Sequence, residues 1–242
     1  MHREYHKWFS PRLCRDMELL VFGRAGMRVL VYPTRGGRFY DYENWGLVQS
    51  LRPRIEAGEL QLYCVDSVDA ESLYCTAIAP AARMRRHLQY ESYVLAEVLP
   101  FSQYLNPDSP LCAHGCSLGA YHAANIAFKY PHLFQKLLAL SGRYDLTLAP
   151  GPYRDLFDGY YDQTIYFNNP SHFLPRLNDP RLLEDLRRMD ITIVIGAEDA
   201  FLENNHQLHM ALKAQKVPHR YYVWQEEAHR ARYWRQMVVL YL

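Results

Sequence analysis

Apolar residues along the chain alternate between short continuous runs and longer stretches with helical spacing. The short runs are rich in aliphatic residues and end at Gly, Pro or Asp, which is typical of buried strands. The predicted strands are Glu18–Gly23, Arg28–Tyr32, Leu60–Val65, Pro110–His114, Lys136–Ser141, Ile191–Ile195 and Arg220–Trp224. Because only the turn Arg24–Gly26 separates the first two, we expect these two to pair as a hairpin.

The stretches with helical spacing fall between the strands, and each gathers its apolar residues on one face. The predicted helices are residues 47–55, 81–98, 120–130, about 181–189, about 205–215 and a last helix after His229. Strands that alternate with helices predict an α/β fold, with a mainly parallel central sheet and helices on both faces, a three-layer sandwich. Without repeats or linkers, residues 1–242 are predicted to form a single domain. Residues 148–180, rich in Pro, Asn, Asp and Tyr, are predicted to be a loop-rich insertion.

Composition narrows the class of protein. Hydrophobic residues make up 49% and charged residues 22% of the chain, as in ordinary globular proteins. The formal net charge of +1 gives no reason to expect nucleic acid or an anionic membrane as a partner. Five cysteines without a C-x-x-C pair indicate free thiols rather than disulfides or zinc ligands. No stretch resembles a signal peptide or a membrane span, so we expect a cytoplasmic protein.

The segment Gly115-Cys-Ser-Leu-Gly119 matches the G-x-S-x-G pattern of a nucleophile elbow. A short apolar strand precedes it and an alanine-rich helix follows it, which is the context that this motif requires. The glycines relieve crowding around a strained turn, and the helix N-terminus favours negative charge where an oxyanion would form. The motif therefore predicts Ser117 as a nucleophile.

A serine hydroxyl needs a base, and this fold places its acid and then its histidine after the serine. Asp199 follows the strand that ends at Ile195, and His229 follows the strand that ends at Trp224. Both loops lie at the same sheet edge as Ser117, so we expect a Ser117–His229–Asp199 triad. For the acid, Glu198 and Asp145 remain alternatives.

Other reactive side chains near the elbow have simpler interpretations. His114 in the strand and His122 on the helix are expected to have structural roles. Cys116 is an alternative nucleophile, but the adjacent serine holds the elbow position, so the cysteine is expected to fill space. His172 and its polar neighbours lack the spacing of a metal site, and no metal is predicted.

Two backbone donors are needed to hold an oxyanion. The first is expected to be the N–H of Leu118, the residue after the nucleophile. The second should come from the loop Thr34-Arg-Gly-Gly-Arg38, where Thr34 or Arg35 lies nearest the strand end. Gly36 and Gly37 are also consistent with a simple tight turn.

These segments together resemble the bacterial "putative esterase" family of α/β-hydrolases, relatives of S-formylglutathione hydrolase and the mycolyltransferases. The resemblance spans nearly the whole chain and uses residues 32–38, 65–67, 114–120 and 196–199, and His229 with Trp234. It implies an esterase-like enzyme without metal or organic cofactor, with its triad on Ser117, Asp199 and His229. Arg230-Ala231 stands where many relatives have Asp-Trp.

The expected reaction is cleavage of a small-molecule carboxylic ester through an acyl-enzyme intermediate. The same triad supports thioesterase, deacetylase or acyltransferase chemistry, and a non-catalytic binding or structural protein that keeps the fold is a further alternative. Tyr160, Tyr161 and Tyr166 in the predicted insertion are candidate substrate contacts, or else packed surface aromatics. The sequence is compatible with a homo-oligomer and does not define the oligomeric state.

Overall fold

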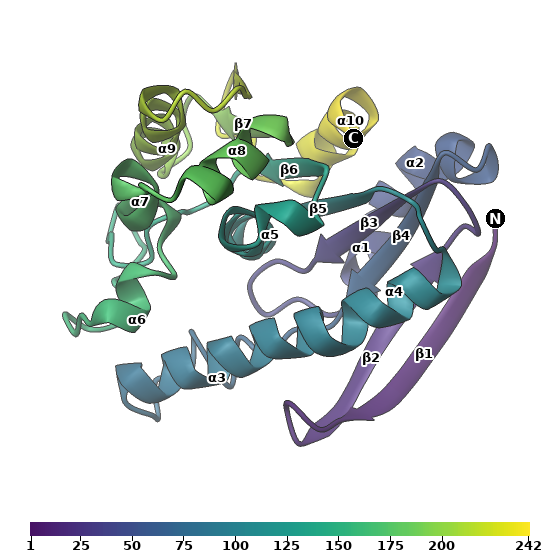
Figure 1. Ribbon diagram of the computed structural model, residues 1–242, viewed down its shortest axis with the longest axis horizontal. Helices are drawn as coiled ribbons and strands as arrows, with labels where there is room; N and C mark the ends of the chain where they lie inside the picture. The colour runs from purple at the N-terminus through teal and green to yellow at the C-terminus, as the bar shows by residue number, and fades with distance from the viewer.

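The computed structural model describes residues 1–242 and contains one eight-stranded sheet with the order β1-β2-β4-β3-β5-β6-β7-β8 (Figure 1). Its strands are β1 (Arg3–Ser10), β2 (Arg15–Phe22), β3 (Met27–Tyr32), β4 (Leu60–Val65), β5 (Leu111–Cys116), β6 (Lys136–Leu140), β7 (Asp190–Gly196) and β8 (Arg220–Trp224). All neighbouring pairs from β4 to β8 are parallel, whereas β1–β2 and β2–β4 are antiparallel. The carboxyl ends of six strands therefore meet at one edge of the sheet.

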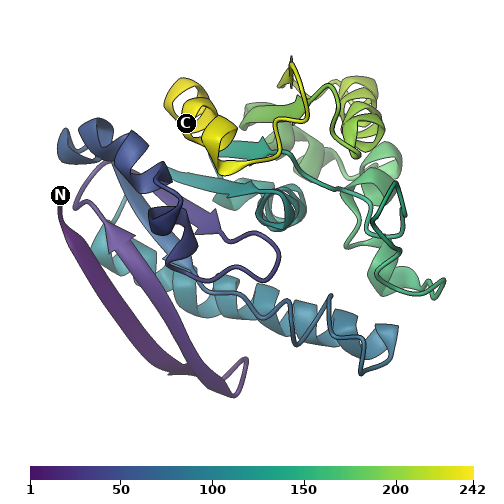
Figure 2. The ribbon, with the colours of Figure 1, turned by 180° about the vertical axis from the view of Figure 1, so that it is seen from behind.

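Helices cover both faces of this sheet (Figures 1 and 2). The helical elements are α1 (Asp41–Asn44), α2 (Leu47–Glu56), α3 (Pro80–Tyr93), η1 (Val94–Val98), α4 (Leu99–Leu105), α5 (Leu118–Lys129), η2 (Pro131–Leu133), α6 (Gln163–Tyr166), α7 (Pro170–Phe173), η3 (Leu174–Arg176), α8 (Pro180–Arg188), α9 (Leu202–Ala214) and α10 (Ala231–Tyr241). One buried cluster joins the sheet to α3, α5, α8 and α9, and another joins its opposite face to α2 and α10. The predicted α/β-hydrolase architecture, a mainly parallel sheet between two helical layers, is confirmed.

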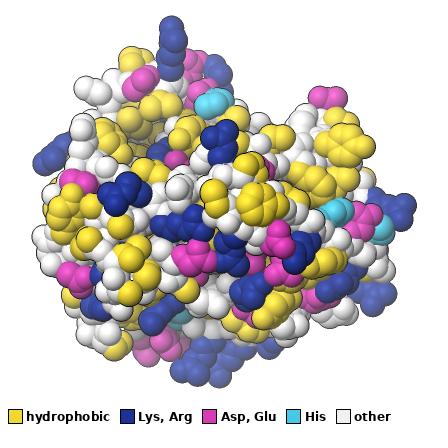
Figure 3. All heavy atoms as spheres, turned by 90° about the horizontal axis from the view of Figure 1, so that it is seen from below, with side chains coloured by type: hydrophobic (Ala, Val, Ile, Leu, Met, Phe, Trp, Pro, Cys, Tyr) yellow, Lys and Arg dark blue, Asp and Glu magenta, His cyan; other side chains and the backbone are white.

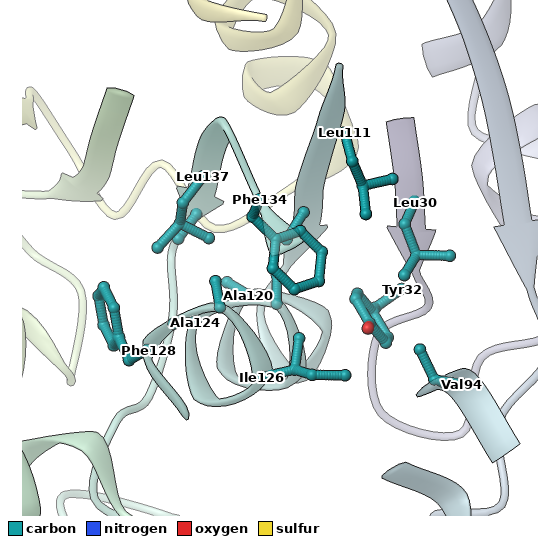
Figure 4. Packing of buried hydrophobic residues seen from close by; sticks show 14 of the residues in the cluster. Leu30, Tyr32, Val94, Leu111, Ala120, Ala124, Ile126, Phe128, Phe134 and Leu137 are labelled. Atoms are coloured by element: carbon teal, nitrogen blue, oxygen red, sulfur yellow. The ribbon is translucent and has the colours of Figure 1, made fainter. Parts of the chain in front are cut away.

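Helix α5 lies close against the middle of the sheet because its inner side chains are small. Ala120 and Ala124 are fully buried and face the strands, as Figure 4 shows. A Cβ atom on Gly119 would lie 2.3 Å from the carbonyl oxygen of Tyr32, so only glycine allows this approach. The helix that begins at the elbow is thus held directly against β3 and β5.

The predicted pairing of the first two strands as a hairpin is wrong. Strand β2 pairs with β1 and β4, and β4 lies between β2 and β3. Strand β1 itself was not predicted, because it is an edge strand whose exposed face carries polar and aromatic residues in alternation. Only the inner face of β1 joins the core, where the centroids of the Trp8 and Tyr93 rings lie 5.9 Å apart.

The predicted helix 81–98 continues further than its apolar spacing indicated. Helices α3 and α4 run on from each other to Leu105 through a π-helical turn at Val94–Val98. Pro100 lacks an N–H, and the wider turn just before it accommodates this residue without breaking the helix. None of the helices is both long and apolar enough to span a membrane.

Residues 148–180 contain only the short helices α6, α7 and η3 among turns. Leu156, Phe157 and Ile165 of this segment are buried against Leu118 and Tyr121 of α5. The segment therefore packs against the helix that follows the elbow. On the face that Figure 3 shows, acidic and basic side chains are interspersed with apolar ones, in keeping with the nearly balanced net charge.

Candidate active site

Ser117 lies in the sharp turn between β5 and α5, at the carboxyl edge of the sheet. Its backbone has φ 56° and ψ −120°, a conformation that a residue with a side chain rarely adopts. Its N–H donates to the carbonyl of Leu140 at 2.8 Å, which fixes the turn to strand β6. A Cβ atom on Gly115 would lie 2.2 Å from the carbonyl carbon of Gly119, so this glycine is required for the tight turn. Ser117 is half-buried and reaches the surface.

His229 and Asp199 complete a chain of hydrogen-bonded side chains with this serine. The His229 Nε2 atom lies 2.9 Å from Ser117 Oγ, and its Nδ1 atom lies 2.6 Å from Asp199 Oδ2. Asp199 is almost fully buried, whereas His229 is half-buried. The second carboxylate oxygen of Asp199, Oδ1, accepts a hydrogen bond from the N–H of Phe201 at 2.9 Å. The structure therefore brings together all three residues that the sequence predicted as the triad.

The loop that carries His229 is fixed from two sides. On one side it packs against the end of β7, where a Cβ atom on Gly196 would lie 1.9 Å from the carbonyl oxygen of Glu227. On the other side, Ser141 Oγ donates to the carbonyl of Ala228 at 3.2 Å and accepts the Trp234 Nε1–H at 3.0 Å. The Trp234 ring also lies edge-on to His229, 5.6 Å between centroids.

The loop Thr34–Arg38 lies next to the elbow, where it was predicted to supply an oxyanion donor. Helix α5 begins at Leu118, and the first N–H groups of a helix have no partner within it. Thr34 lines a narrow cavity that also includes Cys116. The Arg35 side chain is exposed, with its guanidinium 4.7 Å from the centroid of Tyr74. The roles of Leu118, Thr34 and Arg35 as oxyanion donors stay predictions.

Two carboxylates to which the sequence analysis assigned no role in the site hold this loop. Asp69 Oδ2 accepts the N–H of Gly36 at 2.6 Å, and Asp66 Oδ1 accepts the Arg38 Nε–H at 2.7 Å. Gly37 N–H also closes a turn onto the carbonyl of Thr34 at 2.9 Å. Asp66 lies directly after a buried strand, and this placement was the available sequence signal for a carboxylate at the sheet edge.

The alternative residues are placed elsewhere. Asp145 hydrogen-bonds His172 at 2.8 Å, and Glu198 is exposed. Burial alone would raise the pKa of Asp145, but hydrogen bonds from His172 and Thr147 outweigh it and lower the pKa. Burial raises the pKa of the Cys116 thiol, which keeps this group protonated and poorly nucleophilic.

His114 and His122 are both buried beside the elbow. His114 contacts the carbonyl of Leu138 and the hydroxyl of Tyr42, each at 2.9 Å. The ring of His122 stacks on Tyr32 with 5.9 Å between centroids. Burial lowers the pKa of each histidine to about 4, so both rings are neutral near pH 7.

The three tyrosines predicted to contact substrate do not contact the triad. Tyr160 donates to Asp162, and Tyr161 lies 2.9 Å from His172 Nδ1. Tyr166 lines surface cavities that do not include Ser117. Tyr153 of this segment packs against the loop that carries Asp199, and 4.5 Å separates the centroids of the Tyr153 and Phe201 rings. A substrate role for Tyr160, Tyr161 and Tyr166 stays a prediction.

The sheet, the helical layers and the elbow turn define the class of this protein, which is an α/β-hydrolase. Residues 37–239 match the family model described as "Putative esterase". The chain therefore belongs to this esterase family and is an esterase-type hydrolase. None of the curated proteins compared with the chain matches it.

Solved structures of esterases and hydrolases share the fold at low sequence identity. A fluorophosphonate-binding serine hydrolase of Staphylococcus aureus, with substrate bound, has a TM-score of 0.74 at 16% identity, covering 99% of this chain and 96% of that one. An S-formylglutathione hydrolase from Staphylococcus aureus has a TM-score of 0.71 at 18% identity, covering 99% and 94%. A ferulic acid esterase has a TM-score of 0.73 at 15% identity, covering 100% and 96%. At these identities the likeness shows the fold alone.

Proposed function

We propose that the protein hydrolyses small carboxylic esters through an acyl-enzyme on Ser117. The observation that carries this proposal is the continuous hydrogen-bonded chain from Ser117 Oγ through His229 to Asp199, located at the strained elbow. The membership of the chain in an esterase family supports the choice of an ester as substrate.

The proposed reaction has two half-reactions. His229 Nε2 takes the Ser117 proton as Oγ attacks the ester carbonyl carbon. The oxyanion of the resulting tetrahedral intermediate accepts hydrogen bonds from backbone N–H groups of Leu118 and of the Thr34–Arg35 segment. The tetrahedral intermediate then collapses, and the bond from its carbon to the alcohol oxygen breaks. The protonated His229 donates its proton to that oxygen, so the alcohol leaves and the acyl group stays bound to Ser117 Oγ as an ester. Water, deprotonated by His229, attacks this ester and releases the carboxylic acid and Ser117.

Asp199 has a positioning role in this scheme. Its buried carboxylate accepts the Nδ1–H of His229, which leaves Nε2 unprotonated and directed at Ser117. The proposed steps use only side chains, backbone N–H groups and water, so we expect turnover to be unchanged by a metal chelator.

The test is hydrolysis of short and medium p-nitrophenyl esters, with labelling by a fluorophosphonate probe in parallel. Wild type should turn over ester and take the label, and Ser117→Ala should lose both while keeping the wild-type circular dichroism spectrum. Ser50→Ala, on the surface helix α2, is the matched control and should behave as wild type. A folded wild type that neither turns over these esters nor takes the label would overturn the proposal.

A further inference from the structure

An apolar cavity of about 420 Å³ lies between the C-terminal end of α5 and the segment from α6 to α8. Its walls are mainly aromatic and aliphatic, from Phe128, Tyr130, Tyr166, Phe173 and Leu182. A volume of this size is in the range of sites for small molecules. None of the triad residues lines it, so it is separate from the candidate active site.

A second, polar cavity of about 330 Å³ adjoins the first, because Tyr166 and Arg176 line both. Its lining adds Tyr161, Ser171 and His172. We call the two cavities together the lateral groove. The groove therefore has an apolar half and a polar half that meet at Arg176.

Arg176 carries the positive charge of the groove that no acidic side chain neutralises. Lys129, at the edge of the apolar half, is paired with Glu91 at 2.7 Å, whereas Arg176 forms no ion pair or hydrogen bond within the protein. The Arg176 side chain is exposed. Because this guanidinium is unpaired, it is available for charged hydrogen bonds with an anionic group of a ligand in the adjoining cavity.

The neighbouring polar groups favour an acceptor of hydrogen bonds. Ser171 Oγ accepts the Asn204 Nδ2–H at 2.9 Å, so its own hydroxyl proton is available to a ligand. His172 is already bonded at both nitrogens, to Asp145 at 2.8 Å and to Tyr161 at 2.9 Å. Both Asp145 carboxylate oxygens already have hydrogen-bond partners within the protein, Oδ2 with His172 and Oδ1 with Thr147.

We propose that the lateral groove binds a small amphipathic carboxylate. The apolar body would lie against Phe128, Phe173 and Leu182, and the carboxylate would accept a bidentate pair of hydrogen bonds from Arg176 and a third from Ser171. A single guanidinium with one hydroxyl matches one negative charge better than the two charges of a phosphate monoester. This site does not depend on the proposed esterase activity.

The test is calorimetric titration with octanoate, comparing wild type with Arg176→Gln. The variant should weaken binding by at least about tenfold, as loss of a charged hydrogen-bond pair does. Arg181→Gln on the surface of α8, which lines neither cavity, is the matched control and should bind as wild type. Octan-1-ol should bind more weakly than octanoate, and acetate should not bind measurably, because each lacks one half of the ligand.

Ser117→Ala separates this site from the active site. Octanoate should bind Ser117→Ala and fluorophosphonate-labelled wild type as it binds unmodified wild type. Equal affinity of Arg176→Gln and Arg181→Gln, loss of binding on labelling, or absence of binding at millimolar octanoate would each overturn the proposal.

Discussion

At the scale of single residues, the fold holds the Ser117 backbone in a conformation that residues with a side chain normally avoid. A positive φ with ψ near −120° is a conformation that glycine adopts readily and that costs other residues on the order of 1–3 kcal/mol. The N–H bond to Leu140 and the close packing of α5 against β3 hold the turn in this conformation. In this conformation Ser117 Oγ lies within hydrogen-bond distance of His229, as the proposed reaction requires.

This strain predicts an unusual order of stability at position 117. Ser117→Gly should be more stable than Ser117→Ala by about 1 kcal/mol, because glycine relaxes the positive φ, although glycine normally destabilises a protein relative to alanine. The free energies of unfolding of the two variants, measured by urea denaturation, check this. The reverse order would mean that the turn is not strained in solution.

Asp199 allows the proposed assignment of the acid to be tested. Asp199→Asn should lower kcat for ester hydrolysis by on the order of 10³–10⁴, because the amide no longer selects the tautomer of His229 that accepts the Ser117 proton. Glu198→Gln changes the exposed neighbour and should leave kcat within about twofold of wild type. If Glu198→Gln abolished activity and Asp199→Asn did not, the acid would be misassigned.

At the scale of secondary-structure elements, the sequence predicted the interior elements better than the edges. Strand β5 is buried along its whole length and reads as an apolar run, which periodicity detects. Strand β1 alternates in exposure and its Tyr5 and Phe9 face solvent, so its pattern lacks a continuous apolar signal. The false hairpin arose because sequence proximity of β2 and β3 does not reveal that β4 inserts between them.

The position of each site residue relative to the strands determines whether the sequence could predict it. Ser117 follows β5 directly, and Asp199 and His229 lie in the loops that follow β7 and β8, so the parallel order of the sheet places all three at one edge. Asp69 and Tyr74 lie in a long connection before α3, where no periodicity fixes the path of the chain. Their contacts with Gly36 and Arg35 arise from tertiary packing, which the sequence pattern does not encode locally.

The loop that carries Asp199 and the loop that carries His229 pack closely together only because residue 196 is glycine. Gly196→Ala should destabilise the protein by about 1–3 kcal/mol and lower kcat by at least about tenfold, because the new Cβ displaces Glu227 and with it His229. Gly151→Ala is the control, since its Cβ would meet open space although its φ is +57°. It should cost about 1 kcal/mol and leave kcat unchanged. Urea denaturation and ester hydrolysis measure the two effects, and a fully active Gly196→Ala would contradict the packing argument.

At the scale of the whole molecule, burial of histidines beside the sheet links folding to pH. Burial lowers the pKa of His114 and of His122 to about 4 each, and that of His87 well below its usual value. In the unfolded chain these groups titrate near pH 6.5. Between about pH 6.5 and pH 4 the unfolded chain therefore binds more protons than the folded protein. The free energy of unfolding should fall as the pH is lowered through this window and should be insensitive to these groups above it.

Replacement of a single buried histidine tests this linkage. His114→Asn should be less stable than wild type at pH 7.5, because it loses contacts to Leu138 and Tyr42, but its stability should fall less steeply between pH 6.5 and 4. The reduction in slope should approach one proton, about 1.4 kcal/mol per pH unit, near the middle of the window. His132→Asn, at an exposed position on η2, should leave the slope as in wild type. Urea denaturation at a series of pH values gives these slopes. Parallel curves for wild type and His114→Asn would mean that His114 is not held neutral by the fold, and the acid sensitivity of the protein would then have to come from its carboxylates.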